Sequence, residues 1–205
     1  MTPQQFTALV KAKEKEIRDA IHRRLPVKIG RIAQDHFQDN FRQGGFVDGG
    51  LHPWPVTRRQ RLRVGDGTSG MQAGGKSANS QYGPLMSARK NLYGSIRYVP
   101  GDAQVVVGTS VPYAAVHNQG ATITSHPRVT PKMRRFAWAK FFANGGGSTA
   151  ANPEADKWKA LALTKKEKLT VTSRIPKRQF IGPSQELSQK VSQAIEKEIT
   201  NILNN

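Results

Sequence analysis

The sequence predicts an α+β fold, in which a small antiparallel sheet of about four strands is packed by helices from both ends of the chain. Two observations carry this prediction. Apolar residues recur at helical spacing in residues 4–41 and again near the C-terminus, and short runs rich in Val and Ile lie between turn residues in the middle of the chain. Long basic loop insertions are expected to interrupt this core.

The N-terminal segment is expected to be a long helix or a pair of helices. Its apolar positions are Phe6, Leu9, Val10, Ile17, Ile21 and Leu25, followed by Ile29, Ile32, Ala33, Phe37 and Phe41. Pro26 interrupts this series, and a proline ring clashes with the preceding helical turn. We therefore predict a kink or break at Pro26, with one apolar stripe running along both halves.

Residues 43–82 are predicted to form a flexible arm. Ten of the 19 glycines fall within residues 43–83, and such a segment buries too little apolar area to offset its ordering entropy. Trp54 is its one bulky anchor. The basic residues that follow are possible contacts for an anionic partner: Arg58, Arg59, Arg61 and Arg63.

The stretch from Gly83 to Gly120 contains the most consistent local signals. We expect a short helix that contains Leu85, Met86 and Leu92 and closes at Gly94. The strands are predicted at Ser95–Val99 and Ala103–Gly108, around the turn Pro100-Gly101-Asp102, with a weaker third strand at Ala121–Ser125. Between them, Val111–Asn118 should form a short helix that ends near Gly120.

Residues 126–167 are predicted to be an insertion. A basic helix is expected within Pro127–Ala143, where Arg134 and Arg135 could contact an anionic partner. A flexible glycine-rich linker and a lysine-rich patch follow, and Leu169–Thr172 is expected to be a fourth strand. An amphipathic C-terminal helix should begin near Pro183, with apolar positions Leu187, Val191, Ala194, Ile195, Ile199 and Ile202. We treat residues 1–205 as a single domain with these two excursions.

The composition limits the classes of function. The formal net charge of +18 favours an anionic partner, either nucleic acid or an acidic protein surface. The chain contains no Cys, which excludes disulfides, thiolate metal sites and Cys nucleophiles. We expect neither a signal peptide nor a membrane partner, because no apolar run approaches the roughly 20 residues that span a bilayer.

Two motifs raise the possibility of catalysis. Residues 70–77 match the phosphate-binding pattern G-x-x-x-x-G-K-[ST], but the flanking sequence lacks the strand and the helix that the motif requires. His117-Asn118 with His126 could form a His-Asn-type nuclease or a metal site, although the nearest acidic residues are Asp102 and Glu154. We expect no catalytic residue, no cofactor and no metal, and we interpret His117 as a residue that caps or packs the short helix.

Two further motifs resemble those of a known family when they are considered together with the segments that precede them in the sequence. They are Tyr113-Ala-Ala-Val-His117-Asn-Gln-Gly120 and Ile175-Pro176-Lys-Arg178-Gln-Phe180-Ile-Gly182, and they follow the Phe41–Pro55 and Val105–Gly108 segments. In this order they resemble the phage virion morphogenesis family, the tail-completion proteins of tailed phages, including Mu-like ones. The long stretch at residues 65–82 and the insertion at residues 127–167 depart from the family pattern.

The resemblance implies a non-enzymatic structural protein of the neck or tail end of a virion. It could be a tail-completion protein, a tail terminator or a head–tail connector, present in the host cytoplasm during assembly and then in the virion. The implied partners are identical subunits in a ring and other neck and tail proteins, with possible non-specific contact with packaged DNA. We expect the motif residues to serve the core and subunit contacts: Tyr113, His117, Gly120, Pro176, Arg178 and Phe180. The alternative is a non-specific DNA-binding protein or a His-Asn-type nuclease, for which binding should fall steeply with salt.

Overall fold

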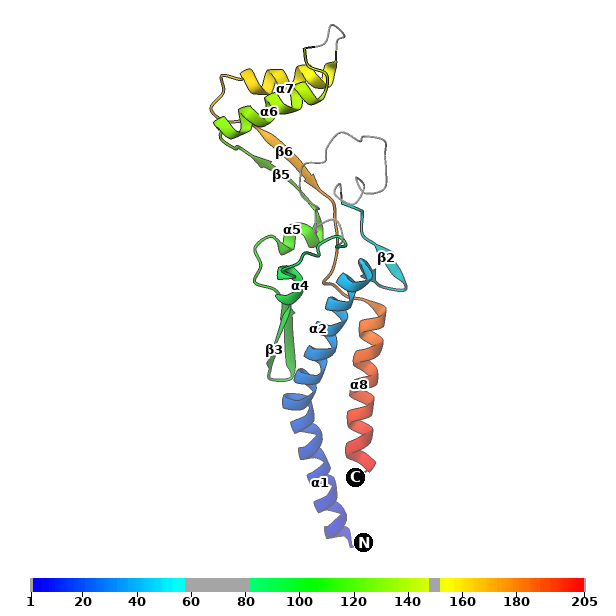
Figure 1. Cartoon of the computed structure of the whole chain (residues 1–205). Helices are drawn as coiled ribbons and strands as arrows, with labels where there is room; N and C mark the ends of the chain where they lie inside the picture. Colours follow the sequence, from blue (N-terminus) through cyan, green and yellow to red (C-terminus); the bar gives the residue numbers. More distant parts are fainter. Residues whose placement is uncertain (1, 58–81, 148–151, 205) are drawn as a thin grey trace. The chain divides into compact units, whose positions relative to one another are not determined.

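The computed structural model describes residues 2–57, 82–147 and 152–204 (Figure 1). Their contacts divide the chain into two compact units. The first contains the described residues up to 57, together with residues 82–120 and 176–204, and the second lies within residues 121–175. The single domain remains a prediction, because compact units need not fold independently.

The N-terminal helical segment is continuous apart from one wide turn. Helix α1 (Pro3–Asp19) passes through the π-helical turn η1 (Ala20–Arg24) into α2 (Leu25–Gln43). The N–H of Leu25 donates to the carbonyl of Ala20, five residues back. The predicted disturbance at Pro26 is therefore a π turn immediately before the proline, which is a known way to relieve strain in a helix.

Pro26 also leaves a carbonyl free for a tertiary contact. Because proline has no N–H, the carbonyl of His22 lacks its usual helical donor. The N–H of Ala103 donates to this carbonyl at 3.4 Å, and the His22 ring lies 2.5 Å from the carboxylate of Asp102. The helix is thus attached at this turn to the tip of a hairpin.

That hairpin consists of β3 (Arg97–Gly101) and β4 (Gln104–Gly108), and it packs on α2. It confirms the predicted hairpin, but Pro100 and Gly101 belong to β3, and the turn is formed by Asp102 and Ala103. Gly30 of α2 permits the contact. A Cβ atom at this position would lie 2.8 Å from Cγ of Tyr98 and 2.9 Å from Cγ2 of Val105.

The first part of the predicted arm is folded. Strands β1 (Gly45–Val47) and β2 (Leu51–Pro53) form a small antiparallel pair, and Phe46 and Trp54 are buried beside it. The arm prediction was therefore wrong for residues 45–54, because these two aromatic side chains supply the apolar burial that its composition did not suggest. Arg58, Arg59, Arg61, Arg63 and the phosphate-binding pattern at 70–77 lie outside the described residues.

The short helix predicted around Leu85 is confined to α4 (Asn91–Gly94). Leu85 and Lys90 have positive φ angles of 62° and 48°, which a continuous right-handed helix cannot contain. The next predicted helix is present as α5 (Ala114–Gln119), and Gly120 follows it with φ 76°.

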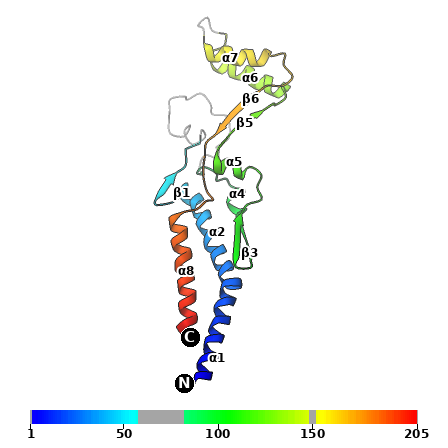
Figure 2. The same cartoon turned by 180° about the vertical axis from the view of Figure 1, so that it is seen from behind.

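The C-terminal helix α8 (Gln185–Asn204) begins two residues after Pro183. The hydroxyl oxygen of Ser184 accepts the N–H of Leu187 at 3.1 Å, which caps the helix. Figure 2 shows α8 running beside α2, and the two helices contact each other. Glu198, which is 6% exposed, pairs with Arg24 at 3.2 Å and with Lys28.

The second unit is a two-stranded sheet that leads into a pair of helices. Strand β5 (Ala121–Ser125) pairs antiparallel with β6 (Val171–Ile175), and α6 (Pro131–Ala143) packs against α7 (Pro153–Leu163). Phe136 and Trp158 join the helices, with ring centroids 5.8 Å apart. The basic helix was predicted, whereas α7 was not, because lysines interrupt its apolar pattern.

The predicted sheet of about four strands is replaced by three separate two-stranded sheets among the described residues. The mixed α+β composition is confirmed. The single sheet is not observed, because β3 pairs with β4 in one unit, whereas β5 pairs with β6 in the other. None of the described helices combines the length and the apolar character that a membrane span requires.

Candidate functional site

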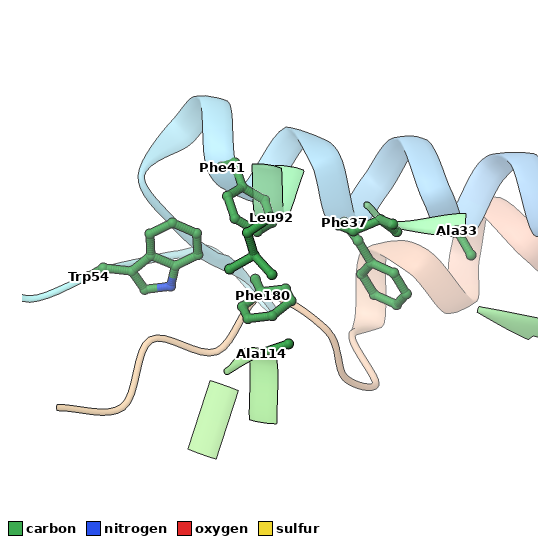
Figure 3. Packing of buried hydrophobic residues seen from close by; sticks show 8 residues of the cluster. Ala33, Phe37, Phe41, Trp54, Leu92, Ala114 and Phe180 are labelled. Carbon is green, nitrogen blue, oxygen red and sulfur yellow. The ribbon is translucent and has the colours of Figure 1, made fainter. Parts of the chain in front are cut away.

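The segment at residues 176–182 lies at the centre of the first unit, and we call it the strap. It has no helix or strand of its own. Its Phe180 is only 1% exposed and packs in the core with Phe41, Trp54 and Leu92 (Figure 3). The rings of Phe180 and Phe41 lie 5.0 Å apart, and Phe41 meets Trp54 edge to face at 5.4 Å.

Asn118 of α5 binds the strap backbone. Its Oδ1 accepts the N–H groups of Phe180 at 2.8 Å and Ile181 at 3.0 Å, and its Nδ2 donates to the carbonyl of Ile181 at 3.0 Å. The N–H of Arg178 also donates to the carbonyl of His117 at 2.8 Å. These bonds satisfy backbone groups of the strap that have no partner in a β-sheet. The two motifs therefore lie on the two sides of one contact.

Two side chains from the N-terminal part of the chain, Asn40 and Trp54, also donate hydrogen bonds to the strap. Asn40 of α2 is 0% exposed, and its Nδ2 donates to the carbonyl of Phe180 at 3.2 Å. Its Oδ1 accepts the N–H of Val47 at 3.1 Å. The indole N–H of Trp54 donates to the carbonyl of Gln179 at 2.7 Å. The strap is thus hydrogen-bonded to α2 and to the chain after β2, and Asn40 links α2 to β1 as well.

Arg178 is buried without an ion-pair partner among the described residues. Its Nε and Nη2 both donate to the carbonyl of Pro55, at 3.1 and 2.9 Å. Burial lowers the pKa of this guanidinium below its ordinary value. A backbone carbonyl takes the place of a carboxylate, so Arg178 fixes the position of the chain after β2.

His117 is partly buried beside Arg178. Within the described part of the chain its Nδ1 has no hydrogen-bond partner. Burial, and then the charge of Arg178, lower the pKa of His117 and favour the neutral ring. The ring of Tyr113 meets it edge to face at 5.9 Å. These side chains border a small pocket of about 260 Å³ that also touches Leu85 and Leu92.

This arrangement gives little support to nuclease chemistry. Both polar atoms of the Asn118 amide are occupied by the strap backbone, so the amide serves to hold the chain. His126 belongs to the other compact unit. Over residues 2–57, 82–147 and 152–204, no three side chains of the His, Asp or Glu type lie close enough together to hold a metal ion.

The structure brings together most of the predicted motif residues. Arg178 and Phe180 are buried, whereas Tyr113 is 46% exposed and Pro176 is exposed. Gly120 adopts φ 76° and ψ 153°, a conformation that strains any residue with a Cβ atom. Whether these residues also contact other subunits stays a prediction.

Asn40 was not among the predicted site residues, and Asn118 was considered only as part of a possible His-Asn-type nuclease. A signal for Asn40 was present, because it lies between Phe37 and Phe41 in the apolar helical pattern. A polar residue near the apolar stripe of a helix needs a hydrogen-bond partner when it is buried.

The two arginines predicted in α6 differ in their surroundings. Arg134 is partly buried, and its Nη1 donates to the carbonyl of Ala162 at 2.9 Å, which ties α6 to α7. Arg135 is exposed. Of this pair, Arg135 is therefore better placed to meet an anionic partner.

Comparison with known protein families gave a match over most of the chain. The model of the phage virion morphogenesis family matches residues 7–200, which is nearly the whole chain. Neither the curated proteins nor the solved structures gave a match.

Proposed function

Because this chain belongs to the phage virion morphogenesis family, whose members are structural virion proteins, we propose that it acts at the neck or tail end of the virion. Its role would be tail completion, tail termination or head–tail connection. It would work as a ring of identical subunits in contact with other neck and tail proteins, first in the host cytoplasm and then in the virion.

The proposal rests on the hydrogen bonds that the two motifs, residues 113–120 and 175–182, make in the folded chain. Their polar atoms hold the strap against α5, α2 and the chain near Trp54. The Asn118 amide and the Arg178 guanidinium, which could serve a reaction in an enzyme, are here hydrogen-bonded to backbone atoms. Such a brace supports a rigid assembly subunit rather than a catalyst.

The surface of α1 supports self-association. None of its residues is buried, and Phe6, Leu9 and Val10 are 58%, 43% and 49% exposed. Exposed apolar residues that share one helix face are typical of a surface covered by another protein. A second copy of the chain is the occupant that a ring requires.

A deletion and complementation experiment tests the role. Phage lacking the gene should produce filled heads and separate tails that do not form infectious particles, and the protein supplied in trans should restore joining. Mass spectrometry of purified particles should detect the protein, and native mass spectrometry of the purified chain should detect a closed oligomer. A strictly monomeric protein that is absent from particles would contradict the proposal.

A further inference from the structure

The pairing of β5 with β6 continues beyond the two strands. Within them, Ala121 lies opposite Ile175 and Ser125 opposite Val171. The same register extends to an isolated bridge between Arg128 and Lys168. Backbone bonds support the extension, since the N–H of Leu169 donates to Pro127 at 2.9 Å and that of Val129 donates to Glu167 at 2.8 Å. We call the paired segments 121–129 and 167–175 the ribbon.

Cross-strand partners project to the same face, and successive residues alternate between faces. One face, which we call the basic face, therefore carries four opposed pairs: Thr122 with Arg174, Thr124 with Thr172, His126 with Thr170, and Arg128 with Lys168. Two side-chain contacts agree with this assignment. The hydroxyl oxygens of Thr124 and Thr172 lie 3.4 Å apart, and the hydroxyl of Thr170 lies 3.4 Å from Nδ1 of His126.

The eight positions of the basic face are all exposed, and none of them is Asp or Glu. The other face is mostly apolar and includes Ile123, Val171 and Leu169. Like charges directly opposite each other destabilise a β-pair, so the opposition of Arg128 and Lys168 costs free energy in the isolated chain. An anion that lies between the two cations would remove this cost.

The charge balance of the second unit points the same way. Residues 121–175 contain eleven Lys and Arg against three Asp and Glu, a net charge of +8. Lys157 pairs with Glu154 in this unit. Among the described residues, the three cations of the basic face, Arg128, Lys168 and Arg174, belong to none of the ion pairs of the structure, so their charges are available to an anionic partner.

We propose that the basic face of the ribbon binds the sugar–phosphate backbone of double-stranded DNA. Arg, Lys and Thr side chains are the usual donors to phosphate oxygens, and the basic face supplies all three types along both strands. A two-stranded ribbon also fits the major groove of B-DNA, which is about 12 Å wide. This goes beyond the assembly role proposed above and does not depend on it.

Nucleic acid suits this surface better than an acidic protein. An acidic protein offers local clusters of carboxylates, whereas the cations and hydroxyls here are spread along the whole ribbon and match a continuous line of phosphates. The face lacks Asn, Gln and Glu side chains for reading adenine or cytosine. Binding should therefore show little dependence on sequence.

The test uses the full-length protein and a fluorescent duplex of random sequence, with anisotropy measured over a range of salt concentrations. The triple variant Arg128→Ala/Lys168→Ala/Arg174→Ala removes the three cations of the basic face. Each phosphate contact contributes about 0.9 to the slope of log K against log salt, so the slope should become shallower by about 2.7. The affinity at low salt should fall by at least about tenfold.

The matched control is Lys11→Ala/Lys15→Ala/Lys190→Ala, which removes the same charge from exposed positions of α1 and α8. It should retain most of the affinity and the slope of the parent. Thermal unfolding of both variants checks their folding, and Arg128→Gln/Lys168→Gln/Arg174→Gln replaces the alanine variant if that variant unfolds.

Three results would overturn the proposal. The first is a parent protein that does not bind duplex DNA at low salt. The second is an equal loss of affinity in the ribbon variant and its control, which would indicate a general charge effect. The third is equally effective competition by polyglutamate at matched charge, which would assign the face to an acidic protein.

Discussion

Asn118 shows how one amide can connect two distant parts of a chain. Its side chain makes three hydrogen bonds to Phe180 and Ile181, 62 and 63 residues away. An amide is suited to this position because it accepts with its oxygen and donates with its nitrogen. A carboxylate in its place would lose the donor and would face the carbonyl of Ile181.

Replacement of this amide should destabilise the first unit. Asn118→Ala leaves strap N–H and C=O groups without partners, and each such group costs about 1–3 kcal/mol when it is buried. Because the site is only partly buried, we expect a loss of about 2 kcal/mol in the free energy of unfolding, measured in urea. Asn201→Ala, at an exposed position of α8, is the control. Equal losses in both variants would contradict the bracing role.

Two histidines should make stability depend on pH. Burial lowers the pKa of His117 and of His36 below the ordinary value of 6.5, with Arg178 and Lys190 as the next causes. The unfolded chain then binds more protons than the folded chain, so stability rises with pH. It should fall as pH is lowered from about 7.5 through the unfolded pKa of about 6.5.

This prediction is checked by chemical unfolding at several pH values above 5.5. His117→Asn should reduce the loss of stability on acidification. His52→Asn removes an exposed histidine for comparison. If the His117 variant retained the full pH dependence of the parent, burial of the neutral ring would not be the cause.

At the level of elements, the sequence predicts helix α2 and the β3–β4 hairpin but not the contact between them. The hairpin follows from the valine-rich strand and its turn residues, and the helix from its 3.6-residue period. Their contact depends on Gly30, whose missing side chain admits Tyr98 and Val105. A glycine within a helical pattern did not by itself reveal which element would approach it.

Gly30→Ala tests this contact. Alanine is the better helix former by about 1 kcal/mol, so an open site would be stabilised by the change. Here the new Cβ atom would meet Tyr98, and overpacking of this kind typically costs about 1–3 kcal/mol. We expect net destabilisation in thermal or urea unfolding.

Making the Gly30→Ala change in a Tyr98→Ala background separates the steric effect of the new Cβ atom from its effect on helix propensity. In that background the Gly30→Ala change should cost less or become favourable, because the nearest ring has been removed. An unchanged cost would rule out the close contact as its cause.

For the molecule as a whole, charge and apolar exposure point to partners. The chain carries +18 overall, and +8 of this lies in residues 121–175. The exposed apolar residues of α1 lie in the other compact unit. We therefore assign self-association and DNA contact to different units as proposals that can fail independently.

Self-association through α1 is testable with Phe6→Ser/Val10→Ser. The change removes apolar area from exposed positions, so it should weaken the oligomer and leave the unfolding free energy of the monomer within about 0.5 kcal/mol. Analytical ultracentrifugation over a concentration series measures the effect. Leu163→Ser, at an exposed position of α7, is the control. An oligomer as stable as that of the parent would exclude α1 from the interface.

The sequence by itself determined the long terminal helices, the β3–β4 hairpin, the short helix α5 and strand β5, because their signals lie within a few consecutive residues. It also indicated the family through the order of its motifs. Only the tertiary structure decided that β5 pairs with β6, that α7 packs on α6, and that Asn118, Asn40 and Trp54 hold the strap. These contacts join residues tens of positions apart, and the hydrogen-bonding needs of buried backbone groups select such partners only when the chain is folded.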